Sequence, residues 1–276
     1  MTYKIILDSS CNLRNLDGID SAVVPLKIGT DEREFVDDAA LDTTAMMEYL
    51  ESYKGRSGTS CPNVGEFLDA FGDAERIFVI TITSNLSGCY NAAVQAKQVY
   101  EQTHPDRKVC TLDTLSTAGE MILIAEKLQE LIGAGMEFEQ IEKNIREYMQ
   151  HTHLLFSLES LNNLARNGRV SNLVAKAVGL LGIRVVGKAS DVGTLEAMHK
   201  VRGNSKALKT LMNLLTEMGY KGGRLHIDHA LNESTAGELA QMIQSVWPGS
   251  RVTVGQCTGL CCFYAERGGV LIGFED

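Results

Sequence analysis

The chain has 276 residues, of which 44% are hydrophobic and 22% are charged, so it is long enough for one large domain or two smaller ones. Its formal net charge of −9 argues against a nucleic-acid-binding surface and against general attraction to an anionic membrane. We see no signal peptide and no apolar run near the roughly 18 residues that span a bilayer, so we expect a cytoplasmic protein with no integral membrane segment.

The chain opens with a predicted buried strand at residues 3–7, followed by the polar cluster Asp8-Ser9-Ser10. Such a cluster at the carboxyl end of a parallel strand either forms part of a site or makes a turn that satisfies its own backbone. Both interpretations remain open at this point.

Residues 22–28 predict an edge strand, because Pro25 has no backbone N–H to donate to a neighbouring strand. A hairpin is expected beyond it, and then a helix capped by Asp42 or Thr43. These elements form a hairpin-helix excursion over residues 22–55 that can pack separately from the main sheet.

A strand, a hydroxyl-rich turn and a helix are predicted in succession at residues 77–83, 84–88 and 89–100. Ligands of open α/β sheets bind beyond the carboxyl ends of strands, and a helix N-terminus offers unpaired N–H groups and a partial positive charge. The turn has no Lys or Arg, which suits one carboxylate better than a polyphosphate. The alternative is that Ser84 and Ser87 only cap the helix.

A further strand at 108–113 leads into helices at 117–131 and 137–150. Repeated strand, polar turn and helix predict a mostly parallel sheet with helices on both faces. We therefore expect an N-terminal α/β domain over residues 1–155.

Beyond residue 156 the pattern predicts a mixed sheet with antiparallel pairs, including a hairpin around the turn 191–194. This gives a C-terminal α/β domain over residues 156–276. The two domains join without a long linker, so we expect them to pack tightly and to leave a cleft between them. A buried helix is predicted at 171–181, and its apolar run 173–181 either lines a slot for an apolar tail or belongs to the core.

The sequence bears on several other kinds of chemistry. Neither a P-loop nor G-x-G-x-x-G is present, so ATP or NAD binding by these loops is not expected. The histidines favour structural roles over a metal site, since His226 and His229 should point to opposite faces of a strand. The alternatives left open are a small hydrolase or acyl transferase using Ser87 or a cleft cysteine, and a redox module. The redox module would use Cys257, Cys261 and Cys262 among seven cysteines that suit a reducing compartment.

An anion-binding turn beside an apolar slot describes a fatty-acid site, and several motifs point the same way. They are Asp8-Ser9-Ser10, Thr59-Ser60-Cys61-Pro62-Asn63-Val64-Gly65-Glu66-Phe67, the turn 84–88 with Tyr90, Gly168-Arg169-Val170-Ser171, and the C-terminal 269–273. In this order and spacing the chain resembles the bacterial DegV family over nearly its whole length. The resemblance implies a non-enzymatic, two-domain α/β protein that binds one long-chain fatty acid such as palmitate or stearate. No other cofactor is implied, and a separate fatty acid kinase subunit makes the acyl phosphate.

The resemblance also implies the site residues. Thr59 and Ser87 are expected to contact the carboxylate, with Ser84 and Ser60 as second choices and Arg169 nearby. The chain departs from the family where a His-Thr-Gly-Pro-Gly segment appears as Cys257-Thr258-Gly259-Leu260-Cys261. A head-group histidine is thus replaced by Cys257, which is a weaker hydrogen-bond donor.

Overall fold

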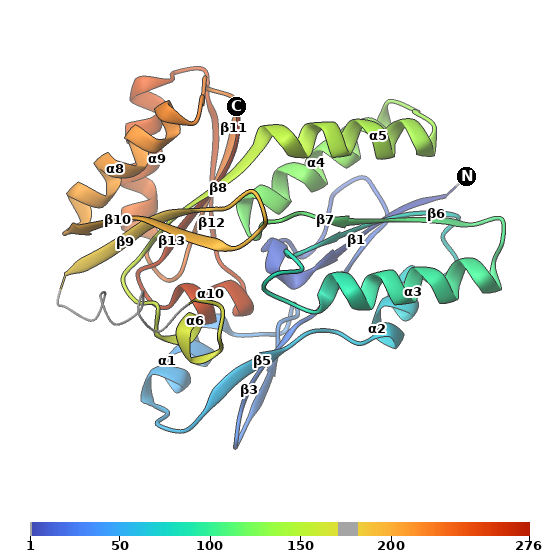
Figure 1. Cartoon of the computed structure of the whole chain (residues 1–276), viewed down its shortest axis with the longest axis horizontal. Helices are drawn as coiled ribbons and strands as arrows, with labels where there is room; N and C mark the ends of the chain where they lie inside the picture. The colour runs from blue at the N-terminus through green and yellow to red at the C-terminus, as the bar shows by residue number, and fades with distance from the viewer. Residues whose placement is uncertain (1, 171–181) are drawn as a thin grey trace.

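The computed structural model describes residues 2–170 and 182–276, and the strands of this part of the chain form three sheets (Figure 1). A parallel sheet lies in the N-terminal part and a mixed sheet in the C-terminal part, both with helices, so the predicted α/β class is confirmed. The helix predicted at 171–181 lies outside the described residues.

The N-terminal sheet has four strands, all parallel, in the order β2-β1-β6-β7. Its central strands are runs of Ile, Val, Leu and Phe because helices cover both faces. On β1, Ile6 packs on the side of α2 and α3, whereas Ile5 and Leu7 pack on the side of α4 and α5 (Figure 1). The elements are β1 (Tyr3–Asp8), η1 (Ser9–Cys11), β2 (Ser21–Val24), α2 (Val64–Phe71), β6 (Arg76–Thr81), α3 (Cys89–Thr103), β7 (Lys108–Asp113), α4 (Gly119–Gly133) and α5 (Phe138–Tyr148).

The C-terminal sheet has six strands in the order β10-β9-β8-β13-β11-β12, with β11 and β12 parallel and the other pairs antiparallel. Helices α8 and α9 cover one face, and α4 packs against the other. The sheet begins at Thr152, and the division into domains 1–155 and 156–276 stays a prediction. The elements are η2 (Met149–His151), β8 (Thr152–Leu158), α6 (Asn162–Arg166), β9 (Ile183–Ala189), β10 (Leu195–Arg202), α8 (Asn204–Glu217), β11 (Arg224–His229), α9 (Glu233–Val246), β12 (Arg251–Gln256) and β13 (Val270–Glu275).

Helix α4 joins the two main sheets because its first turn lies directly on β13. An added Cβ at Gly273 would lie 2.1 Å from the backbone nitrogen of Glu120, so only glycine allows this approach. The fold thus packs its two halves through backbone contact at this point.

The prediction of one continuous strand at 22–28 is wrong. The segment divides at Pro25 into β2, which belongs to the parallel sheet, and β3, which belongs to a separate antiparallel sheet with the order β4-β3-β5. Proline ends the first ladder because it has no N–H to donate. The predicted hairpin forms, and Asp42 caps the following helix by accepting from the backbone N–H of Ala45. The elements are β3 (Lys27–Thr30), β4 (Glu34–Val36), α1 (Thr43–Ser52) and β5 (Ser57–Ser60).

Glu120 of α4 is a buried carboxyl group whose Oε1 accepts a 2.9 Å hydrogen bond from the hydroxyl of Thr152. Burial raises its pKa from 4.5 to about 7, although the Ser116 and Thr152 hydroxyls oppose the shift. An acid whose pKa is raised by folding contributes stability that is complete below pH 4.5 and is lost as the pH rises through 7.

We therefore expect the free energy of unfolding to decline between pH 4.5 and 7, and Glu120→Gln to remove the upper part of that decline. Urea titrations at a series of pH values measure this. The exposed Glu147 of α5 provides the control variant Glu147→Gln, which should follow the parent curve. An unchanged pH profile in Glu120→Gln would contradict the assignment.

Candidate functional site

A cavity of about 300 Å³ lies between the N-terminal and C-terminal halves of the chain. Its wall draws side chains from the mixed sheet, from the segments just beyond β2 and β6, from β5 and from the short helix α10 (Gly259–Ala265), and most of these side chains are apolar. Such a wall favours a hydrocarbon chain over a polar ligand. The apolar residues are Leu26, Ile82, Leu86, Phe156, Leu158, Leu164, Leu195, Leu260, Ala265 and Leu271.

Hydroxyl groups enter the same wall from four separate segments. Thr59 and Ser60 come from β5, Ser87 from the turn before α3, Thr117 from the segment before α4, and Tyr264 from α10. Thr59 Oγ1 lies 2.7 Å from the hydroxyl oxygen of Tyr264. Thr59 and Ser87, which the sequence separates by 28 positions, therefore line one cavity.

The Ser87 hydroxyl is held by the first residue of α3. Its Oγ donates to Sγ of Cys89 at 3.1 Å and accepts from the backbone N–H of Cys89 at 3.3 Å. The N-cap of α3 is Gly88, and no side chain caps this helix end. Ser87 therefore satisfies one backbone N–H at the start of α3 from outside the N-cap position. The bond from Ser87 to sulfur is a weak one that a better acceptor can replace.

Ser84 and Cys257 are not part of the cavity wall. The backbone N–H of Ser84 donates to Asp113 Oδ1 at 3.1 Å, which fixes the start of the turn. Cys257 is 2% exposed, and its carbonyl oxygen accepts from the thiol of Cys262 at 3.3 Å. The cysteines that do line the cavity are Cys61, which follows β5, and Cys261, in the first turn of α10.

Arg169 bridges the cavity wall and the turn before α3. Its Nε donates to the carbonyl oxygen of Leu86 at 3.1 Å, and its guanidinium carbon lies 5.8 Å from the ring centre of Tyr264. A second contact joins the guanidinium to the carbonyl oxygen of Asn167. The arginine is half-buried at the wall, beside the hydroxyl pair.

The cluster after β1 acts as a turn that serves the backbone. Asp8 is fully buried, and its carboxyl group accepts from the backbone N–H of Ile82 at 2.7 Å and of Ser10 at 3.0 Å. Burial raises the pKa of Asp8 to about 6, although these donors partly oppose the shift. The cluster fixes the ends of β1 and β6, and none of its side chains lines the cavity.

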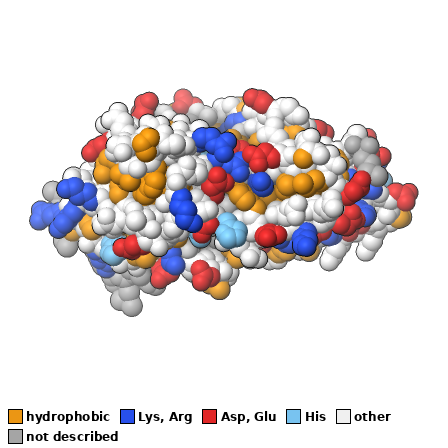
Figure 2. All heavy atoms as spheres, turned by 90° about the horizontal axis from the view of Figure 1, so that it is seen from above, with side chains coloured by type: hydrophobic (Ala, Val, Ile, Leu, Met, Phe, Trp, Pro, Cys, Tyr) orange, Lys and Arg blue, Asp and Glu red, His pale blue; other side chains and the backbone are white. Residues whose placement is uncertain are grey.

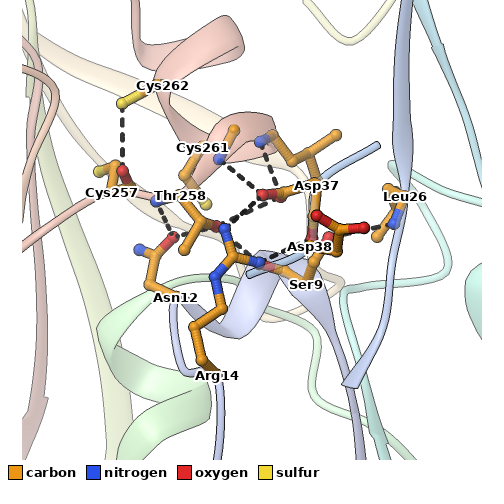
Figure 3. Close-up of polar contacts among 12 residues, drawn as sticks. Ser9, Asn12, Arg14, Leu26, Asp37, Asp38, Cys257, Thr258, Cys261 and Cys262 are labelled. Atoms are coloured by element: carbon orange, nitrogen blue, oxygen red, sulfur yellow. Dashed lines mark hydrogen bonds and ion pairs between the residues drawn. The ribbon is translucent and has the colours of Figure 1, made fainter. Parts of the chain in front are cut away.

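Helix α10 is anchored at its N-terminus by Asp37, which follows β4 (Figure 3). The two carboxylate oxygens accept from the backbone N–H groups of Gly259 at 2.8 Å and Leu260 at 2.9 Å, and Arg14 donates to Asp37 Oδ1 at 2.9 Å. Thr258 donates to the carbonyl oxygen of Ser9 at 2.9 Å. These contacts fix the helix that carries Tyr264 and Cys261 to the cavity.

The chemistry of Cys257 and Cys261 disfavours a catalytic or redox-sensing role for these two thiols. All seven cysteines are free thiols. Burial raises the pKa values of Cys257 and Cys261 well above the usual range, so both keep their protons at neutral pH, and the thiolate is the reactive form. In residues 2–170 and 182–276, no three His, Cys, Asp or Glu side chains are grouped so that they could hold a metal ion.

Sequence reasoning missed Tyr264, because no element was predicted over 259–265. The signal was present, since Thr258-Gly259 precedes a short apolar run, as at many helix starts. Helix α2 was missed as well, although Asn63 and Glu66 form a capping box around its first turn.

The chain is similar over its whole length to known proteins. A DegV domain-containing protein of Streptococcus pneumoniae is 43% identical over the whole chain and 99% of its own length. A DegV family protein from Eubacterium eligens, solved loaded with heptadecanoic acid, is 47% identical with a TM-score of 0.97 over 99% of each chain. The Streptococcus pneumoniae Fatty Acid Kinase (Fak) B3 protein, solved loaded with linoleic acid, is 42% identical with a TM-score of 0.98 over 100% of this chain and 99% of that one.

The match extends to the family level. A family model described as "Uncharacterised protein, DegV family" covers residues 2–275. Since both the family model and these relatives span almost the full length, the resemblance seen in the motifs is confirmed, and the chain belongs to the DegV family.

Proposed function

We propose that the protein binds one long-chain fatty acid, such as palmitate or stearate, with its carboxylate among the cavity hydroxyls and its tail along the apolar wall. The observation that carries the proposal is that Thr59, Ser87 and the apolar wall belong to one and the same cavity. The fatty acids in the Eubacterium eligens protein and in the Fak B3 protein support it.

Uncharged donors hold the carboxylate in this proposal. Taking a carboxylate out of water is costly unless several hydrogen bonds replace its hydration. Thr59, Ser87 and Ser60 supply hydroxyls, and the guanidinium of Arg169 lies at the same wall to favour the negative charge. The proposal gives Ser84 and Cys257 no contact with the ligand, in contrast to the sequence-based expectation.

The protein acts as a carrier and not as an enzyme in this proposal, and needs no cofactor besides the fatty acid. It presents the carboxylate to a separate fatty acid kinase subunit, which supplies the phosphoryl-transfer chemistry. The kinase is inferred from the name of the similar Fak B3 protein. Ser87 as a nucleophile is disfavoured, because the contacts of its hydroxyl are the N–H and sulfur of Cys89, and neither is a general base.

We infer a cytoplasmic carrier that does not bind nucleic acid. On the face shown in Figure 2, acidic and basic side chains lie interspersed. The formal net charge of the whole chain is −9. In the described part of the chain, no helix combines the length and apolar character needed to cross a bilayer. Free thiols fit a reducing compartment.

Ser87→Ala should weaken palmitate binding by about 1–3 kcal/mol, because the carboxylate loses a hydroxyl donor. Isothermal titration of delipidated protein with palmitate measures the loss. The matched control is Ser84→Ala, three residues earlier in the same turn and outside the cavity wall, which should bind like the parent.

Equal affinities for Ser87→Ala and the parent would remove Ser87 from the site. The proposed function has a separate test, which is mass spectrometry of an organic extract of the purified protein. A long-chain fatty acid in that extract, or saturable palmitate binding after delipidation, is expected. The absence of both would exclude the function.

A further inference from the structure

The hydroxyl of Tyr264 is the least expected polar group at the cavity. Its ring projects from α10 into the wall, and its oxygen lies 2.7 Å from Oγ1 of Thr59 on β5. The two residues are 205 positions apart, and both belong to the wall that also holds Ser87. Tyr264 therefore stands at the same place as the residues proposed to bind the carboxylate.

Hydrogen counting shows what this pair offers to a ligand. Each hydroxyl carries one hydrogen, and the bond between them uses one of the two. Whichever group donates, one O–H hydrogen of the pair is left for another acceptor. A carboxylate oxygen accepts hydrogen bonds more strongly than a neutral hydroxyl does, so it is the favoured acceptor for that hydrogen.

The surroundings keep Tyr264 a donor. Burial raises the pKa of its phenol, while the Thr59 hydroxyl and the guanidinium of Arg169 oppose the shift, so the group stays protonated at neutral pH. The guanidinium carbon, 5.8 Å from the ring centre, places a positive charge beside the hydroxyl pair. A bound anion would thus meet an O–H donor and a cation together.

The position of Cys257 strengthens the case. This residue is 2% exposed and lies outside the wall. A donor for the head group from this part of the chain must come from a later residue. Helix α10, which Asp37 anchors at Gly259 and Leu260, brings Tyr264 to the wall instead.

We propose that Tyr264 contacts the carboxylate of the bound fatty acid directly and makes the cavity select the free acid over a neutral head group. This inference rests on the proposed function. It adds a specificity-determining residue to that site. The hydroxyl of Tyr264, rather than its ring, carries the discrimination, because the ring serves only as wall for the ligand.

The test is Tyr264→Phe, which removes the hydroxyl and keeps the ring. Binding of palmitate and of methyl palmitate is measured for the parent and the variant. We expect palmitate to bind about tenfold more weakly to the variant, and methyl palmitate to change by less than roughly twofold, since the ester is a poorer acceptor. The matched control is Tyr220→Phe, whose buried hydroxyl donates to the carbonyl oxygen of Gly223 at 3.0 Å, and which should leave both affinities unchanged.

Two further measurements test the same pair: the first does not need the Tyr264→Phe variant, and the second combines that variant with Thr59→Val. In the parent, the carbonyl resonance of palmitate labelled with ¹³C at the carboxyl carbon should shift on binding, and Thr59→Val should move the bound resonance while Tyr220→Phe should not. In a double-mutant cycle, Thr59→Val and Tyr264→Phe should be non-additive, because they remove the two halves of one pair.

The outcomes separate the two proposals. Parent protein that binds no palmitate overturns the proposed function. Parent protein that binds palmitate, with a Tyr264→Phe variant of equal affinity, overturns the role of Tyr264. Equal losses of affinity for palmitate and for methyl palmitate in Tyr264→Phe overturn it as well, since they would show that the hydroxyl contributes to tail binding or to folding and not to recognition of the carboxylate.

Discussion

Asp37→Ala lowers the free energy of unfolding by about 3 kcal/mol, because it removes the anion from a buried cluster of donors. The substitution leaves the backbone N–H groups of Gly259 and Leu260 without their acceptor and takes from Arg14 its ion-pair partner. Urea denaturation, read as the change in midpoint at constant slope, measures the loss. Asp37→Asn should lower the free energy of unfolding by less than Asp37→Ala does, because an amide keeps one acceptor oxygen but not two.

The neighbouring Asp38 gives the matched control. It is exposed and accepts from the backbone N–H of Ala40 at 2.9 Å, so Asp38→Ala should cost less than about 1 kcal/mol. If Asp37→Ala and Asp38→Ala unfold at the same urea concentration, the anchoring of α10 does not depend on the Asp37 carboxylate.

Palmitate should bind more tightly than laurate by about 3 kcal/mol, or roughly 200-fold, because laurate has four fewer methylene groups and each buried methylene contributes about 0.8 kcal/mol. The physical reason is the wall of leucines and Phe156 that lines the cavity. Competition binding with saturated acids of 10 to 16 carbons measures the slope of affinity against chain length.

Ser87→Ala serves as the control for this series. It acts on the head group, so it should weaken every member by the same factor and leave the slope unchanged. Equal affinities for laurate and palmitate would show that the tail remains in water, and the cavity would then not be the tail site.

Local sequence was enough to predict most of the α/β framework. Strands β1, β6 and β7 were predicted because buried parallel strands are continuous apolar runs, and the start of α1 because Asp42 is a strong N-cap. The β9–β10 hairpin followed from its turn residues. These signals depend on residues close together in the chain, so they can be interpreted without knowledge of the fold.

Short elements held by distant partners escaped prediction. β5 reads Ser-Gly-Thr-Ser and has little strand propensity, and it exists because β3 pairs with it. Helix α10 has seven residues, too few to be stable alone, and is held by Asp37 from more than 200 positions away. Pro25 indicated an edge, but only the pairing partners decided that β2 and β3 belong to different sheets.

The sequence by itself determined the chemical character of the protein: a parallel α/β framework, a hydroxyl-rich turn that contains no Lys or Arg, and the family motifs. The tertiary structure alone decided which side chains share a cavity. Thr59 and Ser87 line it, Ser84 and Cys257 do not, and Tyr264 lies beside Thr59 in its wall. The physical reason is that a side chain's character is fixed by covalent structure and local propensity. Its neighbours are fixed by packing among elements far apart in the chain, which no local pattern encodes.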